Sequence, residues 1–234
     1  EHPQFTPSNT LEPNDIQKKF ITVESNTYTI GLEENNLPYD NEQPMHSVEL
    51  DSFKIASLPV SNGAYLHFMN SNAYSTKEIW SDAGWAWCIN NKQSHPHHWQ
   101  RHKSGVWYGI DHQGPFSLAE EQAVYGLNHY EAEAYAKWAG GRLPHEYEWE
   151  VADKNVQLEQ TGTVWEWCSN AFHPYDGFSP YPYATYSAPY FDGQHYLLKG
   201  GSRYTKKHIK RASFRNYYQP DKRHIFAGCR LVYD

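Results

Sequence analysis

The sequence predicts an α+β fold built from short strands, two or three helices and much irregular structure. One amphipathic helical pattern spans residues 128–139, and a second, shorter helical segment follows Pro144. Elsewhere apolar and polar residues alternate over only a few positions at a time, which is typical of short strands. Prolines interrupt residues 171–194 repeatedly, and no regular element tolerates so many, so a long loop is expected there.

The helical pattern places Tyr130, Ala134 and Trp138 four residues apart on one face. Asn128 is a good N-cap, and Gly140-Gly141 stands where such a helix is expected to end. Arg142-Leu143-Pro144 is predicted to start the second helix, with the proline in its first turn. The segment Gly162-Thr163-Val164-Trp165-Glu166-Trp167 is β-prone, and its large aromatic side chains are expected in the core.

The remaining segments are shorter. Residues 1–18 are polar and proline-containing and are predicted to be a linker or arm, followed by one domain over residues 19–234. Strands at 21–23 and 28–30 are expected to form a hairpin around Ser25-Asn26. Residues 80–113, rich in Trp and His, are expected to be irregular. Further strands are predicted at 46–50, 53–55, 196–202, 212–218 and 226–232, and a helix is predicted to follow Pro59.

The charge pattern narrows the classes of ligand. The formal net charge of -7 argues against general nucleic-acid binding, which depends on neutralising phosphates. Residues 199–230 nevertheless carry ten basic residues and one acid, whereas residues 1–60 carry ten acids and three bases. Such a basic segment in an acidic protein favours either a site for a small anionic ligand or a solvated face balanced by the acidic part.

The number and spacing of the cysteines bear on the cellular compartment, and the hydropathy bears on membrane association. Cys88, Cys168 and Cys229 are an odd set with no close pair, which fits neither a disulfide framework nor a zinc site. A reducing, cytoplasmic location is therefore expected. The sequence contains no apolar run long enough for a membrane span and no signal peptide, so no membrane association is predicted.

Four ordered motifs resemble one family. They are Ala134-x-Ala136-x-Trp138-Ala139-Gly140-Gly141-Arg142-Leu143-Pro144-x-Glu146-x-Glu148-Trp149-Glu150, the 162–167 segment, Leu198-x-Gly200-Gly201-Ser202, and Gly228-x-Arg230-Leu231. This arrangement resembles the sulfatase-modifying-factor family, which includes formylglycine-generating enzymes and the sulfoxide synthases of ergothioneine and ovothiol biosynthesis. The resemblance covers residues 20–233 and implies a C-type-lectin-like fold.

Within that family the sulfoxide synthases are the better match. Formylglycine-generating enzymes bind copper through two cysteines shortly after the Gly-Gly-Ser turn, and Thr205 and Lys210 stand at those places here. Thiolates suit Cu(I), so formylglycine formation is disfavoured. Trp80-Ser81-Asp82-x-Gly84-Trp85-x-Trp87 and the proline-rich loop around Tyr183 instead resemble the ergothioneine-type enzymes.

That resemblance implies a non-heme Fe(II) that joins a thiol to the imidazole of a histidine betaine and oxidises the sulfur with O2. In the family, three histidines on a separate N-terminal four-helix-bundle domain hold the iron. That domain is absent from this chain, so the expected partner is a bundle domain in cis or in trans, and no metal ligand is assigned here. Some members bind calcium near the 162–167 turn, but Thr163 replaces the asparagine expected there.

The resemblance also assigns site residues. Tyr183 matches a loop tyrosine that donates a proton in some members; the alternative is that it is one packed aromatic among many. Arg215, Tyr218, Lys222 and Arg223 are the candidate substrate-binding residues, in a region where family members hold the carboxylates of the thiol. Tyr218 and Lys222 stand where some members have an acid and an arginine, which leaves the identity of the thiol open. One concave site shared by Tyr183 and residues 203–223 is expected.

Two alternatives remain. His98 and His102 are four residues apart and would share one face of a helix as metal ligands. No acid follows them closely, and Gly105 and Trp107 favour a surface loop that also contains His95 and His97. The chain as a whole would also suit a C-type-lectin-like binding module that displays its Tyr-, Arg- and Lys-rich loops to a ligand without catalysis.

Overall fold

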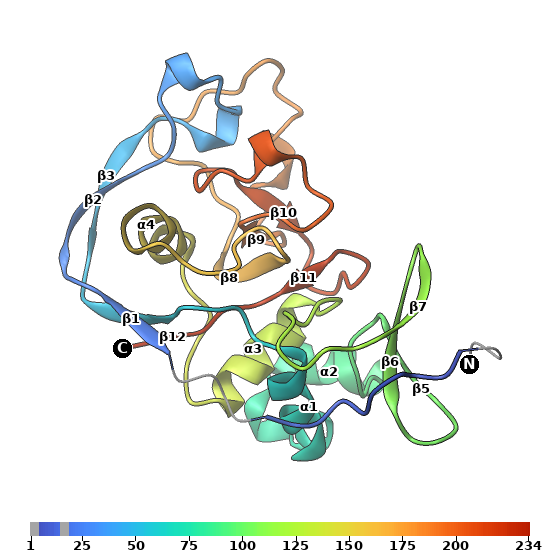
Figure 1. Ribbon diagram of the computed structural model, residues 1–234. Helices are drawn as coiled ribbons and strands as arrows, with labels where there is room; N and C mark the ends of the chain where they lie inside the picture. The colour runs from blue at the N-terminus through green and yellow to red at the C-terminus, as the bar shows by residue number, and fades with distance from the viewer. Residues whose placement is uncertain (1–4, 15–18) are drawn as a thin grey trace.

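The computed structural model describes residues 5–14 and 19–234. Its helices and strands are short and are separated by long connections (Figure 1), so the α+β prediction is confirmed. The α-helices are α1 (Asn62–Asn70), α2 (Asp82–Asn90), α3 (His129–Trp138) and α4 (Glu146–Val156). The strands are β1 (Phe20–Val23), β2 (Asn26–Ile30), β3 (His46–Leu50), β4 (Phe53–Ala56), β5 (Trp99–Arg101), β6 (Trp107–Asp111), β7 (Gly114–Ser117), β8 (Trp165–Ala171), β9 (Tyr196–Lys199), β10 (Asn216–Tyr218), β11 (Ala227–Gly228) and β12 (Val232–Tyr233).

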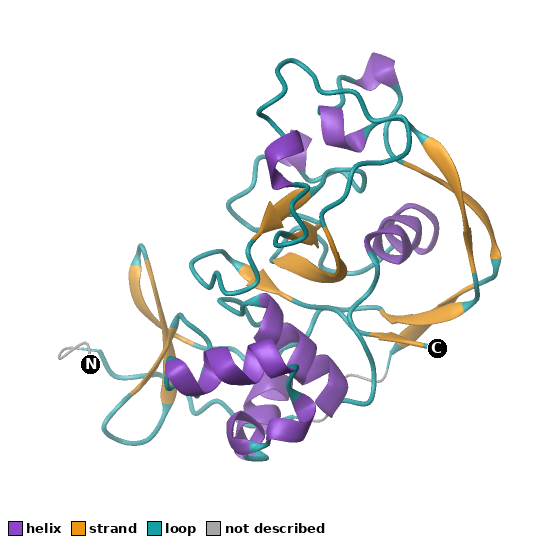
Figure 2. Ribbon diagram, turned by 180° about the vertical axis from the view of Figure 1, so that it is seen from behind, coloured by secondary structure: helices purple, strands orange, loops and turns teal. Residues whose placement is uncertain are grey.

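Helix α4 lies at the centre of one half of the molecule. Figure 2 shows α1, α2 and α3 gathered in the other half, while strands curve around α4. One wall around α4 is the four-stranded sheet β10-β9-β8-β11, and the other is the ribbon of β2 and β3. Strands β5, β6 and β7 form a separate small sheet beside the helices.

The predicted hairpin between residues 21–23 and 28–30 is wrong. Strand β1 pairs with β4 and β2 pairs with β3, so β1–β2 and β3–β4 are the two sides of one long ribbon that bends around α4. A two-residue turn favours residues with positive φ. Gly31, at the end of β2, has a φ of 83°, whereas neither Ser25 nor Asn26 has positive φ. The chain therefore reverses after β2 and not before it.

Two helix predictions also need correction. Helix α2 occupies part of the segment predicted to be irregular, and the Ser81 hydroxyl caps it by accepting a hydrogen bond from the Gly84 N–H. Helix α4 begins after His145, so Pro144 precedes the N-cap and is not in the first turn. The carboxylate of Glu148 accepts from the backbone N–H of His145 at 2.7 Å, which fixes the start at this residue.

The expected cap of α3 is confirmed. The Asn128 side chain accepts from the N–H of Glu131 at 2.9 Å, and the Glu131 carboxylate accepts from the N–H of Asn128 at 3.0 Å. This capping box satisfies two backbone donors at the first turn. It also buries the Glu131 carboxylate completely at the start of the helix.

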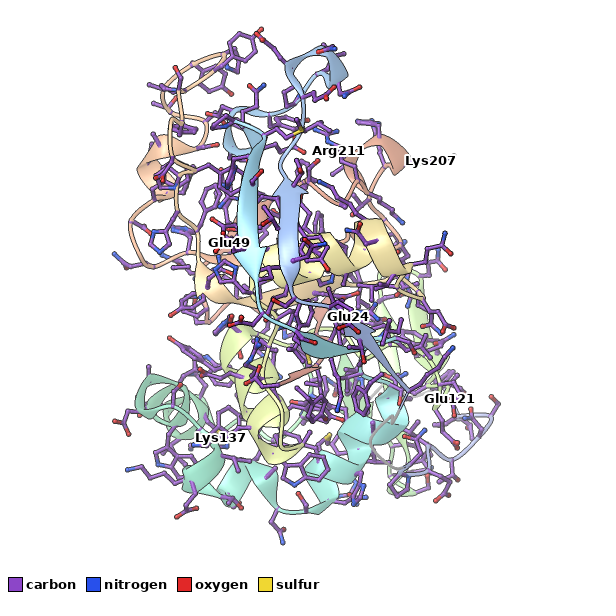
Figure 3. The ribbon with its side chains drawn as sticks, turned by 90° about the vertical axis from the view of Figure 1, so that its left-hand side faces the viewer. Glu24, Glu49, Glu121, Lys137, Lys207 and Arg211 are labelled. Atoms are coloured by element: carbon purple, nitrogen blue, oxygen red, sulfur yellow. The ribbon has the colours of Figure 1, made fainter. Side chains whose placement is uncertain are left out.

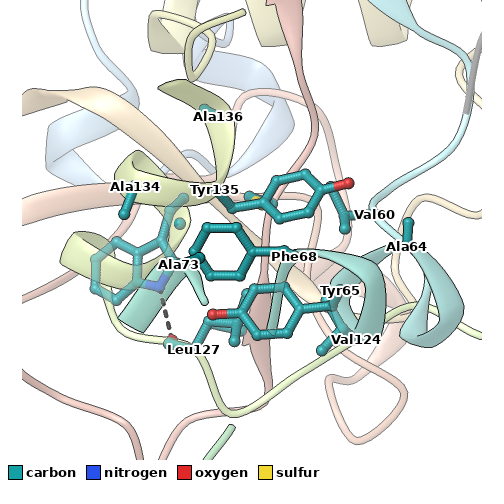
Figure 4. Packing of buried hydrophobic residues seen from close by; sticks show 14 of the residues in the cluster. Val60, Ala64, Tyr65, Phe68, Ala73, Val124, Leu127, Ala134, Tyr135 and Ala136 are labelled. Atoms are coloured by element: carbon teal, nitrogen blue, oxygen red, sulfur yellow. Dashed lines mark hydrogen bonds between the residues drawn. The ribbon is translucent and has the colours of Figure 1, made fainter. Parts of the chain in front are cut away.

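The core is aromatic, as predicted. Tyr65 stacks on Tyr135 with ring centroids 5.5 Å apart, and Phe68 packs edge-on against Tyr135 at 5.4 Å. Figure 4 shows these three rings grouped between α1 and α3. The buried indole N–H of Trp167 donates to the Leu127 carbonyl at 3.0 Å, so the polar end of this large side chain has a partner.

The described part of residues 1–18 contacts the domain. Leu11 is buried, the Asn9 side-chain amide donates to the Leu118 carbonyl at 2.9 Å, and the Asn14 N–H donates to the Gly63 carbonyl at 3.2 Å. Residues 1–4 and 15–18 lie outside the described residues. Among the described helices, none combines the length and the apolar character that crossing a bilayer requires.

Stability should fall on mild acidification because of His129. This residue is buried, and burial lowers its pKa to about 4. The unfolded chain, with a histidine pKa of about 6.5, therefore binds a proton that the folded chain cannot accept. We expect the free energy of unfolding to decrease by up to about 1.4 kcal/mol per pH unit as pH falls from 6.5 toward 4.

Urea unfolding at several pH values between 7 and 4.5 measures this slope. His129→Gln should make it shallower, whereas the matched change His208→Gln, at an exposed histidine, should leave it unchanged. Equal slopes for wild type and His129→Gln would contradict the assignment.

Candidate functional site

Tyr183 lies in the exposed part of the loop between β8 and β9, and 57% of its surface is accessible. Its ring is 6.1 Å from that of Tyr186, which stacks on Tyr39 at 5.4 Å. The Tyr217 hydroxyl donates to the Tyr186 carbonyl at 2.8 Å and so attaches this loop to β10. Burial raises the pKa of Tyr217 to about 12, with smaller contributions from neighbours that include Tyr183.

Arg215 lies in the interior beneath this loop. Its guanidinium binds both oxygens of Glu146, at 2.7 and 2.8 Å. It also donates to the carbonyls of Asn41 and His173, both at 2.7 Å, and it stacks over the Tyr175 ring at 4.1 Å. Only 1% of Arg215 is exposed, so the residue connects the loop to α4 and does not face the surface.

Arg223 joins three segments on the other side of β10. Its guanidinium donates to both oxygens of Glu131 at 3.0 Å, to the side-chain oxygen of Gln93 and to the carbonyl of His95. It also lies over the Trp87 ring at 5.5 Å. The 219–226 loop is therefore fastened to α3 and to the segment that follows α2.

Tyr218 and Lys222 lie near Arg223 in the sequence and are more accessible than Arg215. Tyr218 pairs with Tyr196 across β10 and β9, and its ring is 5.6 Å from His224. The Lys222 ammonium is 3.1 Å from the Asp221 carboxylate in a pair exposed to solvent. A hollow of about 420 Å³ opens beside this pair and is lined by Tyr130, Gly193, Gln194, Tyr196, Gln219, Pro220 and Asp221.

The contacts of the candidate residues therefore fall into two groups. Successive side chains of a strand point to opposite faces. Tyr217 accordingly faces the loop that carries Tyr183, while Tyr218 faces His224 and the segment of Lys222 and Arg223. The single concave site expected for all of them stays a prediction.

Half of the ten bases in the basic C-terminal segment are paired inside the protein. Five of its bases form ion pairs with buried carboxylates, namely Lys199–Glu150, Arg211–Glu42, Arg215–Glu146, Arg223–Glu131 and Arg230–Glu166. Lys206 and Lys207 are exposed. In Figure 3, Lys207 lies at the periphery, and Arg211 lies nearer to the ribbon of β2 and β3. These five ion pairs account for half of the bases, and of the acids in residues 1–60 only Glu42 contributes to them among the described residues.

The histidine-rich segment does not form a helix. His98 and His102 flank strand β5, so their spacing does not place them on one helical face. The His98 ring stacks on Phe226 with centroids 5.2 Å apart, and burial lowers the pKa of His98 to about 4. His102 hydrogen-bonds the Ser104 hydroxyl at 2.7 Å. Across residues 5–14 and 19–234, no three His, Cys, Asp or Glu side chains come together in a way that would hold a metal ion.

Thr205 and Lys210 meet at the Gly-Gly-Ser turn. The Thr205 hydroxyl accepts from the Ser202 N–H at 2.9 Å, and the Lys210 ammonium donates to the Gly162 carbonyl at 2.7 Å. A Cβ placed on Gly201 would lie 2.9 Å from the Lys210 side chain and 3.4 Å from Thr205. The two positions are therefore neighbours, and they carry a hydroxyl and an ammonium instead of thiols.

One polar cluster was not singled out from the sequence as a site. Asp40 and Asn41 are buried beside Ser187 of the long loop, and the Asn41 side-chain amide donates to the Ser187 hydroxyl at 3.0 Å. In the sequence these residues belong to an acidic, Asn-rich stretch that is typical of exposed loops.

Comparison with known proteins identifies relatives of this arrangement. Residues 7–161 and 156–234 match the family model of the sulfatase-modifying factor enzyme 1-like domain. Hercynine oxygenase of Mycolicibacterium thermoresistibile is 32% identical over 257 residues, which cover 88% of this chain and 57% of that protein. Ergothioneine biosynthesis protein 1 of Schizosaccharomyces pombe is 28% identical over 253 residues, which cover 94% of this chain and 30% of that protein.

The structure of PvdO from Pseudomonas aeruginosa superposes with a TM-score of 0.59 at 14% identity, covering 97% of this chain and 98% of that one. This likeness concerns the fold, and together with the family match it confirms the predicted sulfatase-modifying-factor fold. The chain spans 57% of the length of the hercynine oxygenase it matches.

Proposed function

Because this chain belongs to the family of sulfatase-modifying factor enzyme 1-like domains, we propose that it is the substrate-binding and catalytic domain of an iron-dependent sulfoxide synthase. The substrates would be a histidine betaine, a thiol and O2. The observation that carries this proposal is the similarity to a hercynine oxygenase along 88% of the chain. Thr205 and Lys210 at the Gly-Gly-Ser turn support it further, because they offer no thiolate pair for the copper chemistry of formylglycine formation.

Iron would have to be held elsewhere. The described residues offer no three-ligand set, and His98 and His102 are separated by a strand, so this domain does not fit the role of iron carrier. We propose that a four-helix-bundle domain, in cis or in trans, supplies the ligands. The residues of this domain are therefore given no role as iron ligands.

Tyr183 is the proposed proton donor. Its phenol is exposed, so the hydroxyl can reach a substrate bound at the surface of this domain, and a phenol can serve as a proton donor. The attachment of its loop to β10 through Tyr217 and Tyr186 limits the movement of the donor. Arg215 would act as a positioning residue beneath the same loop, since its donors already bind Glu146, Asn41 and His173.

Lys222 is the proposed contact for a carboxylate of the thiol. In the part of the chain that the structure describes, its ion pair is with the exposed Asp221 alone, so exchanging that partner for a substrate anion costs little. Tyr218 would form part of the wall of the same subsite, and Arg223 would hold the loop that presents both. All three cysteines are buried and free, and burial raises the pKa of each thiol, which is consistent with a cytoplasmic protein that does not use them as nucleophiles.

Lys222→Ala should weaken thiol binding. Loss of a hydrogen bond to a charged group costs about 1.5–3 kcal/mol, so KM for the thiol should rise roughly 10- to 150-fold. The melting temperature should change little, because the side chain is exposed. Steady-state kinetics of the complete enzyme, with each substrate titrated separately, give the comparison.

Lys207→Ala is the matched control, because Lys207 is an exposed lysine of the same basic segment without a proposed role. If Lys222→Ala left KM for the thiol unchanged and raised KM for the histidine betaine, Lys222 would contact the histidine betaine and not the thiol.

The proposed function itself is tested with the full-length protein. Oxygen uptake and product mass are measured with a histidine betaine and a panel of thiols that differ in the number of carboxylates. O2-dependent formation of a sulfoxide that joins the two substrates is the expected result. Binding of a carbohydrate or protein surface without turnover would instead favour a C-type-lectin-like binding module.

A further inference from the structure

Asp40 differs from every other buried carboxylate of the described residues. Each of the others has a lysine or arginine partner, namely Glu42, Glu131, Glu146, Glu148, Glu150 and Glu166. Asp40 is only 1% exposed and forms no such ion pair within the described residues. An ionised carboxylate that is buried without a compensating charge is costly, so this position calls for an additional positive partner.

Two oxygen atoms at this position also lack hydrogen-bond partners. The Ser187 hydroxyl donates to Oδ1 of Asp40, but Oδ2 has no partner among residues 5–14 and 19–234. The neighbouring Asn41 uses its Nδ2 to donate to the same hydroxyl at 3.0 Å, and its Oδ1 has no partner either. Asp40, Asn41 and Ser187 are all at least 98% buried. Two unpartnered acceptors therefore lie around one shared hydroxyl.

The surrounding charges do not neutralise Asp40. Arg211 is paired with Glu42, and Arg215 is paired with Glu146 and also donates to the backbone carbonyl of Asn41. The cluster thus contains three carboxylates and two guanidinium groups. The carboxylates thus outnumber the guanidinium groups by one, and Asp40 is the carboxylate without a guanidinium partner.

We propose that Asp40 Oδ2 and Asn41 Oδ1 bind a hard, oxygen-preferring metal cation. Carboxylate and amide oxygens are the ligands that Ca²⁺ and the alkali cations take in proteins, and a bound cation satisfies both the residual charge and the two unpartnered acceptors. Soft metals are disfavoured because the cluster holds neither sulfur nor imidazole. This inference rests on Asp40 and its neighbours and is independent of the proposed enzymatic activity.

The cation would join two segments that lie far apart in the sequence. Asp40 and Asn41 belong to the connection between β2 and β3, whereas Ser187 lies four residues after Tyr183 in the long loop. Binding would therefore order the base of the loop that carries Tyr183. It would also make the stability of the chain depend on the cation, because only the folded state assembles the site.

The test uses the chain in its present form. The protein is treated with a chelator, exchanged into a buffer whose only cation is organic, and melted with increasing Ca²⁺, Mg²⁺, Na⁺ or K⁺. At a hundredfold excess over Kd we expect one of these ions to raise Tm by about 5–10 °C. Equilibrium dialysis of the stripped wild type against that ion should show one ion bound per chain.

Asp40→Asn should remove the saturable Tm increase, and Asp51→Asn, at an exposed acid, should retain it. If the stripped wild type takes up none of the four ions at millimolar concentration, the proposal is overturned, whether or not the Asp40 variant folds. An Asp40→Asn protein that is as stable as the cation-loaded wild type would equally overturn it, because it would show that Asp40 is neutral in the folded chain.

Discussion

Arg215→Ala is expected to lower the free energy of unfolding by about 3–5 kcal/mol, because it leaves the carboxylate of Glu146 buried and unpaired. The guanidinium makes four hydrogen bonds, two to Glu146 and one each to the carbonyls of Asn41 and His173. The substitution would remove all four hydrogen bonds, and water could not replace them well because Arg215 is buried. For a domain of this size the corresponding decrease in Tm is about 6–20 °C. Urea and thermal unfolding of the isolated chain measure both quantities.

Glu146→Gln combined with Arg215→Met provides the matched control, because it removes both charges while keeping much of the volume. This double variant should recover a substantial part of the lost stability, since it leaves no unpaired charge at this buried position. If Arg215→Ala lowered the free energy of unfolding by less than about 1 kcal/mol, the pair would behave as a surface pair and the interior role would be wrong.

Tyr183→Phe is expected to reduce kcat of the complete enzyme by a factor of about 10²–10⁴, the usual contribution of a positioned acid or base. The substitution removes only the hydroxyl, so the ring contact with Tyr186 is retained. KM for both substrates should change little, because the proposed proton transfer matters in the transition state and not in binding. Rapid-quench single-turnover kinetics would separate this step from product release.

Tyr181→Phe is the control for the same loop. Tyr181 is 68% exposed, two residues before Tyr183, and has no proposed role. The proton-donor assignment fails if the two variants have equal kcat, or if Tyr183→Phe alters the product ratio without slowing turnover.

Local signals in the sequence were sufficient for part of the fold. The start of α3 could be predicted because Asn128 and Glu131 are three residues apart and form a complete capping box. Helix α2 was missed although Ser81 caps it, because Trp85, Gly84 and Trp87 do not follow a helical apolar repeat. The hairpin was misplaced because Ser25-Asn26 has the composition of a turn but not its backbone conformation.

The candidate site was harder to predict because its interactions are long-range. Glu42 and Arg211 are 169 residues apart, and Glu131 and Arg223 are 92 apart, so each of these residues taken alone is typical of a solvated surface. The interior position of Arg215 was therefore not predicted. The position of Thr205 beside Lys210 was anticipated only through the family resemblance. The separation of Tyr217 and Tyr218 onto two faces follows from the strand geometry of β10.

The pairing of buried acids with C-terminal bases has a consequence for biosynthesis. The carboxylates of Glu42, Glu131, Glu146, Glu150 and Glu166 precede residue 170, whereas their partners all lie between Lys199 and Arg230. A nascent chain synthesised from its N-terminus thus carries five acids destined for the interior before any of these partners has left the ribosome. The helices can form early, but the interior around α4 can close only after Arg230 has been synthesised. Premature termination before residue 199 would leave a product that cannot complete its core and is open to proteolysis.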